Sequence, residues 1–147
     1  MYITRKDMLE VIGRMQDLEN KLGNQCATPN YDLRENLGRR NQLLRCVQEK
    51  ETARVLRKKY ATVLDDGAPG KPDVVICDIG KELECKLTSG SKSGGSVSFS
   101  LQTDYATLKN KKTLDYLFIL ANAAFDEFCV IFFEGLTIDD YFPPASG

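Results

Sequence analysis

The sequence predicts a mixed α/β fold, in which helices flank a central mixed sheet and an N-terminal region is helical. At 5–22 and 41–60, apolar side chains recur every three to four positions, as in amphipathic helices, with an irregular stretch at 24–40 between them. From residue 73 onward, short segments instead alternate or run continuously in β-branched and aromatic residues. A chain of 147 residues with 42% hydrophobic content can bury one core, so we expect a single domain over 1–147.

Two helices are expected before the sheet. Thr4 followed by Asp7 resembles a capping box and predicts a helix over 5–22. Its apolar stripe is expected to pack on the protein's own core, with a dimer contact as the alternative. The stripe comprises Met8, Leu9, Val11, Ile12, Met15, Leu18 or Glu19, and Leu22.

The second helix is predicted over 41–60. At about 100° per residue, Leu44, Val47, Glu51 and Val55 fall in one sector of roughly 80°. Glu51 is therefore expected on the apolar face, with Glu49 pointing elsewhere. A carboxylate in that position needs a partner, and Arg54 or Lys58 is one candidate.

A β-hairpin is predicted from strands at 73–79 and 82–88, joined by a two-residue turn at Gly80-Lys81. This turn would pair Asp73 with Thr88. Because an even loop keeps paired side chains on one face, the hairpin is expected to have a charged face and an apolar face. The charged face would carry Asp73, Val75, Cys77, Glu82, Glu84 and Lys86, and the apolar face Val74, Ile76, Leu83, Cys85 and Leu87.

The C-terminal half predicts further strands. A strand with one polar face is expected at 97–102, followed by a short helix at 103–112. The continuous apolar runs at 116–121 and 128–133 are typical of central strands buried on both faces. A capped final turn is expected at Thr137.

Composition excludes several classes of site. The chain has no His, which excludes Ser-His-Asp hydrolases, His-based nucleases and most zinc enzymes. Its five Cys lack Cys-x-x-Cys spacing, so we expect reduced thiols and a cytoplasmic location. No apolar run is long enough for a transmembrane helix, and no membrane partner is expected.

The charged hairpin face has the residues needed for phosphodiester hydrolysis. Two converging carboxylates can hold a hard divalent cation, and a neighbouring ammonium group can orient or deprotonate water. Two adjacent carboxylates favour a charged lysine, so orienting water is the expected role of Lys86. The alternative is an ordinary solvated hairpin face.

Pro72-Asp73 and Glu84-Cys85-Lys86, with ten residues between the Asp and the Glu, resemble the motif of PD-(D/E)xK nucleases. The order of elements extends the resemblance to a restriction-endonuclease-like core at 42–134, preceded by an N-terminal region at 1–40 that could contact DNA or a second subunit. Within the group, the chain is most similar to small type II restriction endonucleases.

The resemblance implies a metal site and roles for its residues. Asp73, Glu84 and the backbone carbonyl of Cys85 would bind Mg²⁺, with Mn²⁺ as a substitute, and Lys86 would position the attacking water. Glu82 is an alternative metal ligand to Glu84. Glu51 would supply the third carboxylate that the family often carries on the helix before the site.

The expected partners are double-stranded DNA and a second copy of the chain. The net charge is only −1, but local basic residues can contact phosphates. The candidate DNA-contacting residues are Arg39, Arg40, Ser91, Lys92, Gln102 and Lys109. The alternatives are a structure-directed resolvase or repair nuclease with the same site, and a non-catalytic DNA-binding or assembly module.

Overall fold

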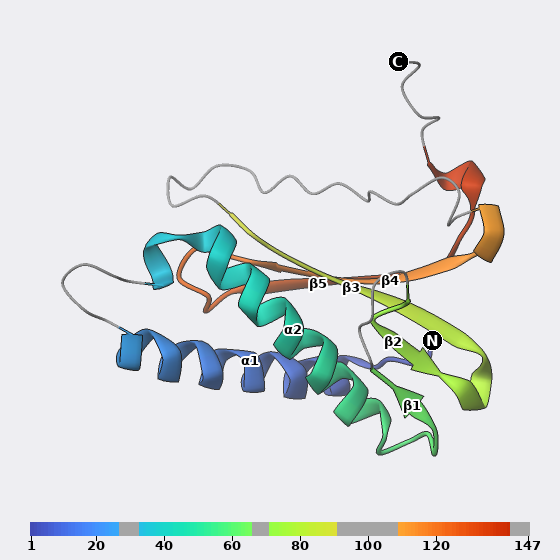
Figure 1. Cartoon of the computed structure of the whole chain (residues 1–147), viewed down its shortest axis with the longest axis horizontal. Coiled ribbons are helices and arrows are strands. Elements are labelled where there is room, and N and C mark those ends of the chain that lie inside the picture. Colours follow the sequence, from blue (N-terminus) through green and yellow to red (C-terminus); the bar gives the residue numbers. More distant parts are fainter. Residues whose placement is uncertain (27–32, 66–70, 91–108, 142–147) are drawn as a thin grey trace.

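Two long helices pack on one face of a five-stranded mixed sheet, which confirms the predicted α/β class (Figure 1). The computed structural model describes residues 1–26, 33–65, 71–90 and 109–141. The helices are α1 (Arg5–Cys26) and α2 (Leu37–Leu56). The strands are β1 (Val63–Leu64), β2 (Val74–Ile76), β3 (Lys81–Ser89), β4 (Leu114–Ala121) and β5 (Phe128–Leu136).

The strands follow one another across the sheet in chain order, β1-β2-β3-β4-β5. β3 and β4 are parallel, and the other neighbouring pairs are antiparallel. The chain passes from β3 to β4 through residues 90–113, and the strand and most of the helix predicted at 97–112 lie outside the described residues. The sheet is therefore mixed, as expected.

The start of α1 agrees with its prediction. The Asp7 carboxylate accepts hydrogen bonds from the backbone N–H and hydroxyl of Thr4, and the Thr4 hydroxyl accepts one from the Asp7 N–H. The helix continues to Cys26, four residues beyond the prediction. Most of its apolar stripe packs on the protein's own core, as expected, with Val11 and Met15 almost completely buried, whereas Leu9 is exposed.

α2 begins at Leu37, four residues before the prediction. The side chain of Asn36 caps it by accepting a hydrogen bond from the Arg39 N–H at 3.1 Å. The helix packs against both α1 and β3, and it crosses the expected boundary between an N-terminal region and a core. The predicted regions 1–40 and 42–134 are therefore joined by one continuous helix.

The hairpin has the predicted faces but not the predicted turn. A short 3-10 helix, Cys77–Ile79, replaces the end of the first strand, and Gly80 follows in the left-handed region at φ 60°. Val74 therefore pairs with Leu83, whereas the predicted turn would pair it with Leu87, four residues later. Because a shift of four is even, each side chain keeps its face, and Val74, Ile76, Leu83 and Cys85 are all completely buried.

The two apolar runs behave differently. β4 is buried along its whole length, as predicted for a central strand. The prediction is wrong for β5, whose residues are mostly half-buried. β5 is the last strand in the sheet order, so it has a neighbour on one side only. The final turn is confirmed, because Thr137 and Asp140 form a capping box.

Neither long helix has the extended apolar stretch that crossing a bilayer demands, as far as the described residues extend.

Candidate active site

Asp73 directly precedes β2, and its carboxylate lies beside β3. Continuing the β2–β3 register by one residue places Asp73 directly opposite Glu84. The Cys85 N–H donates to Asp73 Oδ2 at 2.7 Å. A strand N–H points sideways in the plane of the sheet, so this bond holds the carboxylate between the two faces of the sheet. Asp73 is only 8% exposed, although it lies next to the end of a strand of only three residues.

Glu84 and Lys86 project from β3 on the same face. Their charged atoms, Oε2 and Nζ, are 3.7 Å apart, and both side chains are half-buried. Burial raises the pKa of Glu84, and the charge of Asp73 raises it further, whereas Lys86, Lys111 and Arg45 act in the opposite direction. The structure therefore brings together the three residues of the predicted motif, Asp73, Glu84 and Lys86.

The helix contributes Glu49, a residue that the sequence interpretation had directed elsewhere. Glu49 Oε1 accepts a hydrogen bond from Arg45 Nε at 3.1 Å, one turn earlier on α2. Burial raises the pKa of Glu49, and Asp73 is the next largest cause, while Arg45 and Lys86 lower it. Glu49 thus shares the electrostatic environment of the motif.

Arg45 connects Asp73 to Glu49. Its Nη2 lies 3.3 Å from both carboxylate oxygens of Asp73 while its Nε binds Glu49. Burial alone would lower the pKa of Arg45, but the two carboxylates outweigh it and raise the pKa above its usual value. The motif itself gave no signal for Arg45. Its position four residues before Glu49, on the same side of the helix, could have suggested the pair.

Glu51, the predicted third carboxylate, faces α1 instead. Its Oε2 accepts a hydrogen bond from Arg54 Nε at 2.5 Å, and the same guanidinium binds Glu10 of α1 at 2.8 Å. The alternative partner Arg54 is therefore correct, and the assignment of Glu51 to the site is wrong. The narrow apolar sector misled because α2 is buried on two sides: besides its apolar residues, it buries Arg40, Gln48 and Thr52.

Glu82, the competing metal ligand, is directed toward a different lysine. Its Oε2 lies 2.8 Å from Lys111 Nζ, and the side chain is 45% exposed, against 21% for Glu84. The pair lines a shallow pocket of about 230 Å³ beside the turn, together with Gly80, Lys81, Thr113 and Asp115. Of the two glutamates, Glu84 is the one opposite Asp73.

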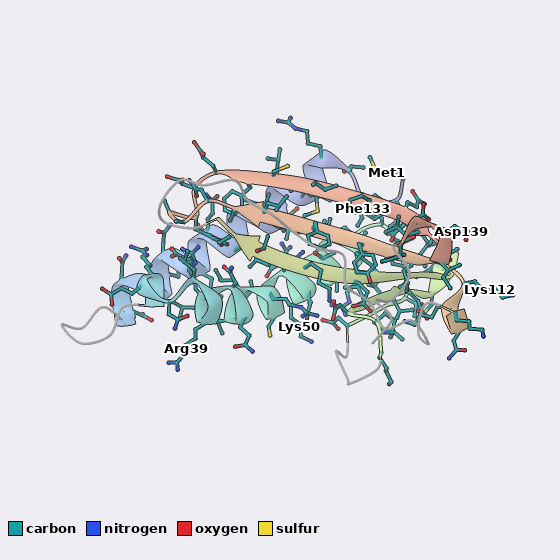
Figure 2. The ribbon with its side chains drawn as sticks, turned by 90° about the horizontal axis from the view of Figure 1, so that it is seen from above. Met1, Arg39, Lys50, Lys112, Phe133 and Asp139 are labelled. Atoms are coloured by element: carbon teal, nitrogen blue, oxygen red, sulfur yellow. The ribbon has the colours of Figure 1, made fainter. Side chains whose placement is uncertain are left out.

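The predicted DNA-contacting residues divide into three groups. Arg40 was predicted wrongly, because its side chain is completely buried, with Nη1 bonded to the Ala123 carbonyl at 2.7 Å and Nη2 to Ser89 Oγ at 3.1 Å. Arg39 and Lys109 are exposed, and Figure 2 shows Arg39 pointing away from the body of the molecule. Ser91, Lys92 and Gln102 lie outside the described residues.

The donor set suits a hard cation, although its arrangement is not that of a closed metal site. Glu49, Asp73, Glu84 and the Cys85 carbonyl offer oxygen ligands, the type that Mg²⁺ prefers. Within the described ranges, however, no three acidic or Cys side chains lie close enough together to enclose an ion. Arg45 lies between two of these carboxylates.

Comparison of the chain with protein-family models, curated proteins and solved structures finds no match.

Proposed function

We propose that this protein is a magnesium-dependent endonuclease that hydrolyses phosphodiester bonds of double-stranded DNA, similar in action to type II restriction endonucleases. One observation carries the proposal. Asp73, directly before β2, and Glu84 and Lys86 of β3 lie together where β3 extends past its pairing with β2; continuing that register places Asp73 opposite Glu84, and Glu84 is 3.7 Å from Lys86.

The burial of the charges supports a functional reading over an ordinary solvated hairpin face. Charged side chains on such a face are usually exposed, whereas Asp73 is 8% exposed and its neighbours Glu49 and Glu84 are half-buried. Burial and repulsion from Asp73 raise the pKa of both glutamates. Groups with such perturbed acidity cluster at functional sites more often than elsewhere.

The residues fit Mg²⁺ by the chemistry of their donors. Asp73 and Glu84 would hold the ion with the Cys85 carbonyl, and Glu49 would be the carboxylate supplied by the helix. When bound, Mg²⁺ polarises the phosphate and makes water more acidic. Mn²⁺ accepts the same oxygen ligands and would substitute for it.

The protein's own groups have separate tasks in this proposal. The Lys86 ammonium group, 3.7 Å from Glu84 Oε2, orients the attacking water by donating a hydrogen bond to it. The Cys85 N–H holds the Asp73 carboxylate at the β3 edge, so the ligand is positioned before substrate arrives. The exposed Arg39 and Lys109 would contact DNA phosphates, and a homodimer would cut both strands.

Cleavage of a mixed-sequence plasmid tests the proposal. We expect wild-type protein with Mg²⁺ to cut the plasmid, and chelation of the metal to stop the reaction. Asp73→Ala and Glu84→Ala should reduce the rate at least about 100-fold, the usual scale for loss of a transition-state contact. Glu82→Ala is the matched control, since it removes a carboxylate two residues away on the same strand and should retain most of the activity.

The pattern of products distinguishes restriction from the other nuclease function. Discrete fragments with a shared end sequence support a restriction-like enzyme. Preferential cutting of a four-way junction instead supports a structure-directed resolvase or repair nuclease. Absence of cleavage on both substrates, over a range of Mg²⁺ and Mn²⁺ concentrations, would contradict the catalytic proposal.

A further inference from the structure

Arg45 holds the position where a cation is needed between the site carboxylates. Its guanidinium lies 3.1 Å from Glu49 and 3.3 Å from both oxygens of Asp73. The Asp73 carboxylate also accepts a hydrogen bond from the Cys85 N–H, so a guanidinium group and a backbone N–H both donate to it. The buried negative charge of Asp73 is therefore compensated by groups of the protein itself.

A metal ion would have to use the same oxygens. Asp73 is the carboxylate common to the expected metal site and the Arg45 pair. A divalent cation and a guanidinium repel each other at such short range, and a carboxylate that accepts hydrogen bonds from the guanidinium is a poorer ligand for the cation. Because the Arg45 side chain is 39% exposed, it has solvent on one side into which it can turn.

We propose that Arg45 is a competing internal cation, which clamps Asp73 and Glu49 in the metal-free protein and is displaced when a divalent ion binds. The inference rests on the proposed function, because it assumes that Asp73 is a metal ligand. It adds a positioning residue that sets the metal affinity of the site. It also explains why the carboxylates remain together without enclosing an ion: Arg45 holds two of them in the metal-free arrangement.

The chain offers a matched control in Arg54. Like Arg45, it lies on α2 and bridges two carboxylates, those of Glu51 and Glu10, and its side chain is 36% exposed. This second bridge faces α1 rather than the β3 edge. Arg54→Met therefore removes a comparable ion pair while leaving the proposed site intact.

The test is calorimetric titration with Ca²⁺, which binds oxygen ligands and permits measurement without turnover. Arg45→Met is expected to bind Ca²⁺ roughly tenfold or more tightly than wild type, the scale on which outer partners of metal ligands alter affinity. Arg54→Met should match wild type. Equal or weaker binding by folded Arg45→Met would overturn the inference while leaving the metal site in place.

A measurement on wild-type protein covers the case in which Arg45→Met does not fold. The nitrogen-15 resonance of Arg45 Nε–H, assigned by its absence in Arg45→Lys, should shift and exchange faster with water when Ca²⁺ is added, because the bond to Glu49 breaks. An unchanged resonance at saturating Ca²⁺ would overturn the inference. If neither wild type nor Arg45→Met binds Ca²⁺, the proposed function fails, and the inference fails with it.

Discussion

Replacing Asp73 in the metal-free protein should separate its structural role from its charge. Asp73→Ala removes the acceptor of the Cys85 N–H and both contacts to Arg45. Asp73→Asn keeps the side-chain shape and one carbonyl oxygen, so the Cys85 N–H retains an acceptor. The comparison therefore isolates the buried hydrogen bond from the ion pair.

The structure determines which of these effects is larger. Cys85 is completely buried, and an unsatisfied buried N–H costs about 1–3 kcal/mol. The ion pair contributes at most about 1 kcal/mol, because the Arg45 side chain is 39% exposed. Removal of Asp73 also relieves repulsion with Glu49 and Glu84, which offsets part of the loss. We expect Asp73→Ala to lower the free energy of unfolding by about 2–3 kcal/mol, and Asp73→Asn by about 1 kcal/mol or less.

Urea unfolding followed by circular dichroism measures both variants. The midpoint should fall in Asp73→Ala with an unchanged slope, and the melting temperature should fall by about 5–10 °C. Asp78→Ala is a suitable control, because it removes an exposed carboxylate that accepts the Thr62 N–H in the same region. If Asp73→Ala remained within about 0.5 kcal/mol of wild type, or if the Ala and Asn variants lost the same stability, the bond to Cys85 would not have the proposed role.

Three further predictions concern neighbouring groups. Glu49→Gln should weaken Ca²⁺ binding about tenfold in calorimetry, whereas Glu51→Gln, whose carboxylate binds Arg54, should leave it unchanged; the reverse order would contradict the assignment. The pKa of Glu84 is raised in the folded state, so its contribution to stability is present at low pH and is lost as pH rises through that pKa. Glu84→Gln should therefore raise the melting temperature of the metal-free protein near pH 7. This gain should shrink below about pH 4, where the carboxyl is protonated in the unfolded chain as well. Arg40→Met should lower the free energy of unfolding by about 2–4 kcal/mol in urea, because it leaves the Ala123 carbonyl and Glu19 short of a buried donor, while the exposed Arg39→Met changes it by about 0.5 kcal/mol or less.

The sequence was informative where local rules decide the structure. The capping residues of α1, the apolar and charged faces of the hairpin, and the buried character of β4 follow from spacing and side-chain chemistry. The hairpin faces survived a wrong turn because the register moved by an even number of residues. Side-chain alternation was thus a more robust guide than turn type.

The misplaced residues depended on tertiary contacts that spacing does not contain. A helical wheel assumes one buried side, but α2 packs on α1 as well as β3, so Glu51 and Glu49 face different neighbours. Arg40 looked like a surface cation, yet it is buried beside Glu19, with its guanidinium carbon 4.9 Å from the centre of the Phe125 ring. β5 had the composition of a central strand, and only the sheet order makes it an edge strand. Each of these outcomes depends on how whole elements pack together, which local sequence patterns do not specify.

The most direct test of the proposed active site is the initial rate of duplex DNA cleavage by wild type and Lys86→Ala, measured side by side at saturating Mg²⁺. Lys6→Ala, which changes an exposed lysine on α1, is the control for a general loss of positive charge. We predict Mg²⁺-dependent cleavage by wild type and Lys6→Ala, and a rate at least about 100-fold lower for Lys86→Ala. Equal rates for Lys86→Ala and wild type, or no cleavage by wild type, would contradict the assignment of Asp73, Glu84 and Lys86 as a nuclease active site.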